Sequence, residues 1–481
     1  MYKQKSVAGI VLFIALALAG CNKWKDHTEV TQQDLTQNLL QTISSNPDLS
    51  KFTEYIHTAG LDSLLKVTKT FTVWAPTNAA MQAIDPATVA DVNKLKAFIL
   101  NHISNQLYFI RDVVQTPVNI QTLSGKYNSF SNLKFGEAGL ATTDRYVSNG
   151  VLHTIKAIVP PVQNIWEFIN ATTAQYAQNA YVVSLNYSGF DPATAIIDSI
   201  SAITGLPVYK PGTGVVARNY FNDKVYDLKR EDKQYTYFVM QDANFVLEAD
   251  SLKNYYSTIS AAVSTDSLTR WNVIKDLAYD IAYQNPLAIP PAIISRFGIT
   301  VPFNNAFVVD VKKLSNGYVY IMSKMDVPTV NKFLTIILQG ESPSGFLSDK
   351  TGNTNYRTRL NPATGINFTD IMVSGHAVTT YYAFYRTNET PSIKYQVYAL
   401  GVNDFQGTAG FNQTINAWHT GLAAVQGALT HAVPLFSAVG AYNEINLGTV
   451  TISKFGTVDW RLTSVTTGPI VLDYLRLVPI P

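Results

Sequence analysis

Seven histidines are the first residues of this sequence that could carry acid–base or metal chemistry. None of them forms a His-Glu-x-x-His motif or a close pair with metal-ligand spacing. The sequence also lacks a Gly-x-Ser-x-Gly elbow, and the glycines at 212 and 214 lack the lysine of a phosphate-binding loop. We therefore predict no catalytic residue, no metal site and no cofactor, so that the chain is not an enzyme. The histidines are His27, His57, His102, His153, His376, His419 and His431.

Carboxylates are frequent in the last third of the chain. A glycoside hydrolase needs two of them at a fixed separation across the bond that it cleaves. Nothing in the sequence pairs any two, so a glycan-degrading enzyme is a less favoured alternative. Asp473 lies within an apolar strand pattern, whose alternation could turn it outward. The available residues are Asp370, Glu389, Asp404, Glu444, Asp459 and Asp473.

Aromatic side chains give a stronger functional signal. The chain has 27 tyrosines, 23 phenylalanines and 6 tryptophans, and flat rings recognise ligands at a low cost in conformational entropy. The alternative, that most of these rings fill the core of a β-sandwich, stays open. The candidate ligand-binding residues are Trp418, Trp460, Tyr385 and Tyr442, with Tyr381, Tyr395 and Tyr398 as further rings of the same region.

Cys21, the single cysteine of the chain, ends an apolar segment that reads LALAGC. The apolar run follows two lysines and is shorter than the ~20 residues that span a bilayer, as in a signal peptide. Its end resembles the bacterial lipobox, in which the peptide is cut before a cysteine that becomes acylated. The resemblance implies a signal peptide at residues 1–20, a lipidated tether at 21–33, and a lipid bilayer as the partner of Cys21.

Length and charge set the broad class of the protein. A chain of 481 residues is long enough for roughly two to four domains. Its 36 basic and 34 acidic residues leave a formal net charge of +2. No cationic surface follows from that balance, so we predict that the protein does not bind nucleic acid.

Helical and strand patterns alternate over residues 34–162. Apolar residues at three- and four-residue spacing predict helices from Leu39 to Ile56 and from Leu95 to His102. Between them, the run FTVWA at residues 71–75 predicts a buried strand that ends in a Pro-Thr-Asn turn. Asn78 in this turn is placed to cap the next helix.

Three segments of this region resemble the motifs of a fasciclin (FAS1) domain. They are FTVWAPTNAAM at 71–81, LKAFILNH at 95–102 and NGVLHTI at 149–155. The resemblance implies a FAS1 domain over residues 34–162, in a family associated with adhesion and extracellular recognition. Asn101 stands where the family has a tyrosine. The resemblance assigns structural roles to Thr72, Pro76, Asn78, His102, Asn149, Gly150 and His153.

Two later segments repeat this pattern. YTYFVMQDANF at 235–245 echoes residues 71–81, and NGYVYI at 316–321 echoes residues 149–155. The repeat predicts a second, divergent FAS1-like domain at 163–328 that opens with a helix at 165–169. An insertion near residues 180–230 has no counterpart in the first copy, so we expect it on the surface, where it could be functional.

Residues 329–481 alternate short aromatic and apolar runs with turn signals, which predicts a β-sandwich of the jelly-roll type. The last run resembles the closing strand of carbohydrate-binding jelly rolls. The predicted fold class is multidomain, α+β and all-β, with two FAS1-like α/β domains followed by a β-sandwich. Strands are predicted at residues 377–385, 393–400, 445–452, 459–463 and 468–479.

These features favour a membrane-anchored, extracytoplasmic lipoprotein that functions in adhesion or recognition. Its expected ligand is a polysaccharide, which it would bind as an accessory to polysaccharide capture. The charged residues after Cys21 are similar to the leaders of Bacteroidetes lipoproteins, so we expect the outer membrane, on its cell-surface or periplasmic face. The alternative is a protein-binding adhesin or scaffold whose partner is an outer-membrane transporter.

Overall fold

The computed structural model describes residues 32–113, 116–131, 133–259, 264–361, 364–404, 410–433, 435 and 442–481. Cys21 and the predicted signal peptide therefore lie outside the described residues. The chain forms two compact units. The first ends at Asn164 and also contains Arg230–Lys233, and the second contains Ile165–Lys229 and Gln234–Pro481. No helix in the described ranges is long and apolar enough to cross a membrane.

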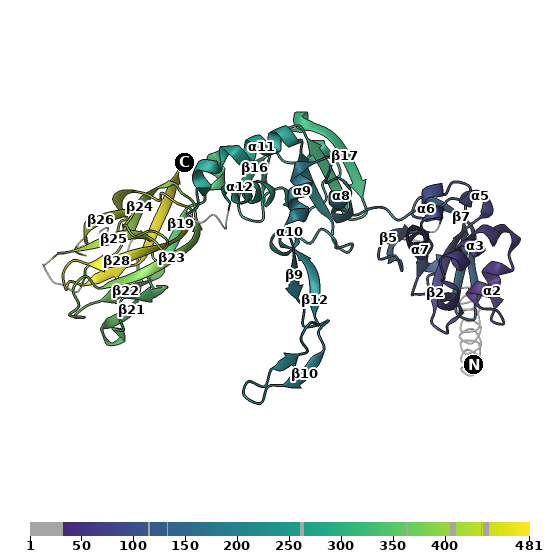
Figure 1. Cartoon of the computed structure of the whole chain (residues 1–481), viewed down its shortest axis with the longest axis horizontal. Coiled ribbons are helices and arrows are strands. Elements are labelled where there is room, and N and C mark those ends of the chain that lie inside the picture. The colour runs from purple at the N-terminus through teal and green to yellow at the C-terminus, as the bar shows by residue number, and fades with distance from the viewer. Residues whose placement is uncertain are drawn as a thin grey trace, which may run out of the picture. The chain divides into compact units, whose positions relative to one another are not determined.

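The first unit is an α/β domain in which short helices accompany a mixed sheet (Figure 1). The sheet has the order β3-β2-β8-β7-β6-β5-β4, and β1 pairs with β7. The strands are β1 (Gln32–Asp34), β2 (Phe71–Pro76), β3 (Ile103–Ser104), β4 (Val118–Gln121), β5 (Tyr127–Phe130), β6 (Lys134–Phe135), β7 (Ala138–Val147) and β8 (Gly150–Ile155). The helices are α2 (Leu39–Ser44), α3 (Ser50–Thr58), α4 (Asp62–Lys66), α5 (Asn78–Met81), α6 (Pro86–Ala90) and α7 (Val92–Leu100).

The parallel pair β2 and β8 forms the centre of this domain, and every residue of both strands is buried. Strands that are buried on both faces need apolar side chains at consecutive positions, which the run FTVWA supplies. The strands approach most closely where Phe71 faces Gly150. A Cβ on Gly150 would lie 2.1 Å from the Phe71 carbonyl oxygen, so the position admits only glycine.

Asn149 connects α2 and the end of α4 to the start of β8 by hydrogen bonds. Its side-chain oxygen accepts a hydrogen bond from the Leu39 N–H (2.7 Å). Its amide group donates to the carbonyl oxygens of Leu65 (2.8 Å) and Val67 (3.0 Å). One buried amide thus satisfies three backbone groups from α2 and from the end of α4, which is the structural role that the resemblance implied.

Thr72 and His153 both hold the loop that follows β3. Thr72 donates to the Gln106 carbonyl oxygen (2.7 Å) and accepts from the Tyr108 N–H (3.0 Å). His153 accepts the Asp144 N–H at Nδ1 (3.2 Å), so its Nε2–H donates to the Tyr108 carbonyl oxygen (2.9 Å). Burial lowers the pKa of His153 and keeps the ring neutral.

His102 is also a structural residue. Its Nδ1 lies 2.8 Å from the Phe98 carbonyl oxygen and donates to it, while Nε2 accepts from the Val159 N–H (3.1 Å). Burial lowers the pKa of His102 to about 4. Because both ring nitrogens are engaged, neither is free to bind a metal or to transfer a proton.

The predicted cap at Asn78 is wrong. Thr77 caps α5 instead, because its hydroxyl accepts the backbone N–H three residues further on (3.3 Å). Asn78 accepts from the Lys51 N–H (2.9 Å) and donates to the Pro47 carbonyl oxygen (2.9 Å), which joins α5 to the start of α3. Pro76 is the buried last residue of β2.

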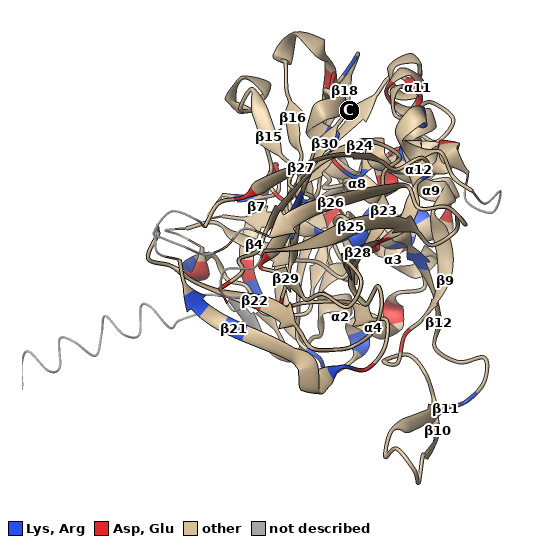
Figure 2. Ribbon diagram, turned by 90° about the vertical axis from the view of Figure 1, so that its left-hand side faces the viewer, with Lys and Arg blue, Asp and Glu red and all other residues tan. Residues whose placement is uncertain are grey.

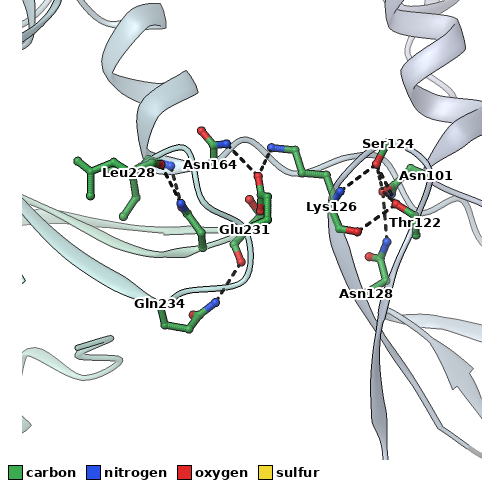
Figure 3. A network of polar contacts seen from close by, with 12 residues as sticks. Asn101, Thr122, Ser124, Lys126, Asn128, Asn164, Leu228, Glu231 and Gln234 are labelled. Atoms are coloured by element: carbon green, nitrogen blue, oxygen red, sulfur yellow. Dashed lines mark hydrogen bonds and ion pairs between the residues drawn. The ribbon is translucent and has the colours of Figure 1, made fainter. Parts of the chain in front are cut away.

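Asn101 organises a polar network beneath the β4–β5 turn (Figure 3). Its side-chain oxygen accepts from the hydroxyls of Thr122 (3.1 Å) and Ser124 (2.8 Å) and from the Asn128 amide (3.2 Å). Its own amide donates to the Val159 carbonyl oxygen (2.9 Å). The residue that departs from the family motif therefore has a structural task of its own.

A second α/β domain opens the second unit. Its four-stranded sheet has the order β14-β13-β18-β17. Its helices are α8 (Ile165–Ala171), α9 (Ala177–Ser184), α10 (Tyr220–Lys224), α11 (Asp242–Ser251) and α12 (Thr265–Ile274). Its strands are β13 (Tyr235–Met240), β14 (Ala278–Tyr279), β17 (Val308–Leu314) and β18 (Gly317–Met322), with a separate hairpin of β15 (Ala292–Ile294) and β16 (Thr300–Pro302).

This domain repeats the strand pairing and several hydrogen bonds of the first one. β13 and β18 are parallel, as β2 and β8 are, and β14 is antiparallel to β13, as β3 is to β2. Asn316 accepts from the Ile165 N–H (2.9 Å) and donates to the Leu228 carbonyl oxygen (2.9 Å), which repeats the role of Asn149. The Tyr320 hydroxyl donates to the Tyr283 carbonyl oxygen (2.7 Å), as His153 does to Tyr108.

The predicted insertion forms an arm between α9 and α10 (Figure 1). Its inner pair is β9 (Asn186–Phe190) with β12 (Val215–Asn219), and its outer pair is β10 (Ile197–Ile200) with β11 (Pro207–Tyr209). Asn219 fixes the base, because its amide donates to the Val182 carbonyl oxygen (2.8 Å) and to the Asn186 side chain (2.9 Å).

The rest of the second unit is a β-sandwich. One sheet contains β19 (Ile336–Gln339), β30 (Tyr474–Ile480), β24 (Lys394–Leu400) and β27 (Ile445–Thr451), in that order. The second contains β20 (Gly345–Phe346), β23 (Tyr382–Thr390), β28 (Gly456–Ser464), β25 (Phe411–His419) and β26 (Gly427–Val433). A third, shorter sheet contains β21 (Thr354–Leu360), β22 (Asn367–Val373) and β29 (Ile470–Leu472).

The strand predicted at residues 377–385 begins later than expected. Ala377 and Thr380 have φ values of 55°, in the left-handed region, so the chain turns there and β23 starts at Tyr382. The run predicted at 468–479 is two strands that belong to different sheets, with Asp473 between them.

Candidate functional site

Trp460 and Tyr385 lie in the core of the sandwich, which overturns the prediction that they bind ligand. They are 0% and 1% exposed. The Trp460 indole donates to the Thr387 hydroxyl (3.1 Å), and the Tyr385 hydroxyl donates to the Gly340 carbonyl oxygen (2.9 Å). Both rings lie on the inward-facing positions of β28 and β23, because side chains alternate along a strand.

Trp418 lies on β25 and is partly exposed. The Arg461 guanidinium lies 4.2 Å from the centre of the Trp418 ring and 4.8 Å from the centre of the Tyr382 ring. This cation–π contact occupies the ring with a protein group. A ligand-binding role for Trp418 stays a prediction.

Tyr442 lines a hollow at one end of the sandwich, which we call the loop pocket. Its volume is about 300 Å³. It lies where the β21–β22 connection, the end of β24 and the start of β30 meet the segment before β27. The lining residues are Asn361, Thr364, Ile366, Asn367, Phe368, Leu400, Tyr442, Asn443, Glu444, Asp473 and Tyr474.

Tyr442 and Asp473 are the central pair of the loop pocket. The Tyr442 ring packs against Phe368, with 4.4 Å between ring centres, and its hydroxyl donates to the Asp473 carboxylate. Asp473 is 5% exposed, so it does not turn outward, which the alternation of its strand pattern had left open. Burial raises the pKa of Asp473 to about 6, opposed by the Tyr442 hydrogen bond and assisted by the negative charge of Asp370.

An ion-pair cluster supports the pocket from behind. Arg357 holds the buried Asp370 with two hydrogen bonds (2.8 and 2.6 Å) and also pairs with Asp404 (2.9 Å). Arg359 pairs with Asp404 and lies 5.6 Å from the centre of the Phe368 ring. Figure 2 shows the basic residues of β21 in blue. Paired guanidinium and carboxylate groups hold each other in fixed planes, which keeps the pocket wall rigid.

The pocket has the chemistry of binding more than of hydrolysis. Three rings and four amide or hydroxyl side chains face a shallow hollow, a combination that suits a hydroxylated ligand. Its two carboxylates are already engaged, Asp473 by Tyr442 and Glu444 by Arg476 (2.7 and 2.5 Å). Among the residues described, no three histidine, cysteine or acidic side chains gather as metal ligands.

Tyr442, Asp473 and Glu444 were named from the sequence, but the other residues of the loop pocket were not. Asn361 follows the end of β21, and Asn367 and Phe368 open β22, about 75 to 80 residues earlier in the chain than Tyr442. The only signal of this region in the sequence was a polar turn, which many loops share.

Comparison with known proteins assigns the first domain. Residues 47–161 match the family model of the fasciclin domain. This range contains the three motifs of the first domain and confirms the predicted FAS1 domain there. The search of curated proteins found no match.

Solved structures of two kinds are similar to parts of the chain. The FAS1 domain pair of the insect cell adhesion molecule fasciclin I is 14% identical, with a TM-score of 0.22, over 60% of this chain and 99% of that one. The C-terminal CBM6 of a laminarinase from Zobellia galactanivorans is 16% identical, with a TM-score of 0.21, over 30% and 99%. A carbohydrate-binding module of Cellvibrio mixtus lichenase, solved with cellotriose, is 18% identical, with a TM-score of 0.22, over 30% and 98%. The fold of the two later domains rests here on their own strand pairing.

Proposed function

We propose that this chain is a membrane-anchored, extracytoplasmic recognition lipoprotein that binds glycan in the loop pocket as an accessory to polysaccharide capture. Its anchor is the acylated Cys21, in the outer membrane. The loop pocket is the observation that carries the proposal, because it joins partly exposed rings to amide and hydroxyl groups. The fasciclin match at residues 47–161 supports a role in adhesion or recognition rather than in catalysis.

The pocket groups suit the two kinds of surface that a sugar presents. The C–H face of a pyranose packs on an aromatic ring, as at other ring-rich recognition surfaces. Its hydroxyls need donors and acceptors, which Asn361, Asn367 and Asn443 can supply. The Asp473 carboxylate, which Tyr442 holds in place, adds a charged acceptor. Hydrogen bonds to a charged acceptor are stronger than those between neutral groups.

A glycan array probed with the chain from Asn22 to Pro481 tests this proposal. We expect retention on one class of plant or microbial polysaccharide. The variant Phe368→Ala removes a pocket ring and is expected to lose most of that signal. The control Tyr356→Ala removes a ring that is 53% exposed on the neighbouring strand β21 and is expected to keep it. An array without any retained glycan would reject the proposal.

The arm favours a second function, as a scaffold for a protein partner. Its outer hairpin exposes aliphatic side chains that no core covers, and Figure 2 shows β10 and β11 almost free of charged residues. An exposed apolar group of this kind marks an interaction surface. The hairpin also has two unpaired strand edges, to which a strand of a partner such as an outer-membrane transporter could add.

A further inference from the structure

A second hollow lies inside the second unit, where the second α/β domain meets the β-sandwich. We call it the junction pocket, and its volume is about 380 Å³. The α/β domain supplies one wall, mainly from α12, and the sandwich supplies the other from β24 and the neighbouring turns. The lining residues are Tyr181, Leu185, Tyr220, Tyr256, Ser267, Leu268, Trp271, Asn272, Lys275, Lys332, Phe333, Leu334, Ile336, Glu389, Pro391, Tyr395 and Phe455.

A hydrogen-bonded seam holds the two walls together. The Ser392 N–H and hydroxyl donate to the carbonyl oxygens of Tyr255 (2.8 Å) and Asn254 (2.9 Å). On the other side of the seam, the Phe455 N–H donates to the Ser257 carbonyl oxygen (2.7 Å). Backbone bonds of this kind fix the separation of the walls, so the hollow is part of the folded structure.

Aromatic rings dominate the lining. Tyr220 and Trp271 pack with 4.8 Å between ring centres, and Tyr256 and Phe455 with 5.3 Å. A cavity of this size lined by rings accommodates a flat ligand of one or two six-membered rings. The aliphatic residues of the lining add apolar surface, so that transfer of the C–H faces of such a ligand from water into the pocket is favourable.

Two tyrosine hydroxyls belong to this lining. Tyr395 and Tyr256 are 1% and 4% exposed as whole residues. Neither hydroxyl oxygen is among the enclosed polar atoms of the described residues that lack a partner, so each can bond to solvent in the hollow. A ligand that carries hydroxyl groups can replace that solvent with hydrogen bonds of its own, whereas a hydrocarbon chain would displace it without replacing those bonds.

The charges of the pocket favour a neutral ligand. The Lys332 ammonium is already paired with Asp276 (2.8 Å) and bonded to the Asn272 carbonyl oxygen (2.9 Å). Burial lowers the pKa of Lys275, which weakens it as a partner for an anion. Glu389 lines the opposite wall and would repel an anion.

We propose that the junction pocket is a second binding site, for a neutral sugar unit of one or two rings, so that the chain holds glycan at two separate places. This inference extends the proposed function, because it assigns the same class of ligand to a site that shares no residue with the loop pocket. A chain with two sites gains avidity for a polymer that reaches both.

Calorimetric titration of the chain from Asn22 to Pro481 with neutral disaccharides tests the site, using cellobiose, mannobiose, xylobiose and maltose as probes. Tyr256→Phe combined with Tyr395→Phe removes only the two hydroxyls, and we expect binding at least about fivefold weaker. Leu268→Trp fills the hollow and should abolish it. Tyr385→Phe is the control, because that residue is as buried as Tyr395 and its hydroxyl is bonded to Gly340 away from the pocket.

The same titration on Tyr442→Ala separates the two sites. Disaccharide binding that survives Tyr442→Ala and is weakened by the hydroxyl variant supports the junction pocket. Wild-type affinity in the hydroxyl variant, loss of all binding on Tyr442→Ala alone, or no disaccharide bound by the wild type overturns it. Unaltered glycan retention by Tyr442→Ala, together with loss in the junction variants, would instead reject the loop pocket and leave the junction pocket standing.

Discussion

At the scale of single residues, the two α/β domains depend on a small set of polar side chains and glycines that satisfy or approach the backbone. Asn149 and Asn316 do the same task in the two copies, and Gly150 and Gly317 follow them at the same close approach. The two Asn-Gly pairs are equivalent because each lies at the start of a parallel strand, where backbone groups need a hydrogen-bonding partner and the neighbouring strand leaves no room for a Cβ. The copy with few motif matches therefore has the same fold.

Gly150→Ala is expected to destabilise the first domain by roughly 3 kcal/mol or more. The new Cβ would lie 2.1 Å from the Phe71 carbonyl oxygen, and a backbone atom of a central strand cannot move aside. Gly139→Ala is the matched control in β7, because the nearest atom to its Cβ would be 4.0 Å away. Urea unfolding of both variants measures the difference, and equal midpoints would contradict the account.

His102 is expected to make the first domain less stable in mild acid. Its pKa is about 4 in the fold and near 6.5 when unfolded, so the unfolded chain binds more protons between these values. Stability is therefore complete above pH 6.5, falls as the pH drops towards 4, and loses on the order of 3 kcal/mol in total.

Hydrogen exchange of the α7 amides at pH 7.5 and pH 5 measures this effect. In the variant His102→Gln, the free energy of opening should depend less on pH, by about 2 kcal/mol over this interval. The His153 ring, which is also buried and neutral, remains in the variant as an internal reference. An unchanged pH dependence in His102→Gln would show that the ring does not titrate as stated.

At the scale of elements, the sequence predicted best where one short segment determines its own surroundings. The runs FTVWA and YTYFV and the two Asn-Gly pairs identify the buried strands and their starts in the two copies, and β2, β13, β8 and β18 lie there. The roles of the aromatic rings in the sandwich were harder to predict, because the alternation of side chains along a strand does not say which face of the sheet is buried. Tyr385 and Trp460 were therefore candidates for ligand binding, although the structure places both in the core. The pockets depend on segments that are distant in the chain, so no local pattern indicated them.

The arm is the element whose sequence pattern was least informative, because its strands pack on no core. Its exposed aliphatic side chains include Ile200 (59%), Ile203 (96%) and Leu206 (65%). Side chains this exposed contribute little to folding, so their apolar character requires another explanation, and an interaction surface gives one.

Ile203→Asp combined with Leu206→Asp is expected to weaken binding of a protein partner without changing stability by more than about 0.5 kcal/mol. Photo-crosslinking from position 204, an exposed residue between the two substituted ones, measures the contact in intact membranes. Leu287→Asp, at a position that is 77% exposed in the same unit, is the control. Crosslinks to lipid alone, or to a second copy of the chain, would assign the arm another partner and reject the scaffold function.

At the scale of the whole molecule, one chain carries three folded domains, which the proposed function treats as recognition domains on a common membrane anchor. The fasciclin domain, the divergent second copy with its arm, and the sandwich with its loop pocket offer separate surfaces. The predicted lipid on Cys21 would hold all of them at a membrane, where weak contacts with a polymer add together.

Cys21→Ser is expected to abolish acylation and to release the protein from the membrane fraction, because the thiol that carries the lipid is gone. Labelling with radioactive palmitate and fractionation of cells measure both effects. Asn22→Gln, a change of similar size at the next residue, should keep label and location. A Cys21→Ser protein that still carries label would disprove the anchor.

The loop pocket is the central claim, and affinity electrophoresis of Tyr442→Ala tests it most directly. The gel contains the polysaccharide that retains the wild-type chain, and Tyr356→Ala runs beside it as the control. We predict strong retardation of the wild type and of Tyr356→Ala, and much weaker retardation of Tyr442→Ala, which keeps only the junction pocket. Equal retardation of all three proteins would contradict this claim.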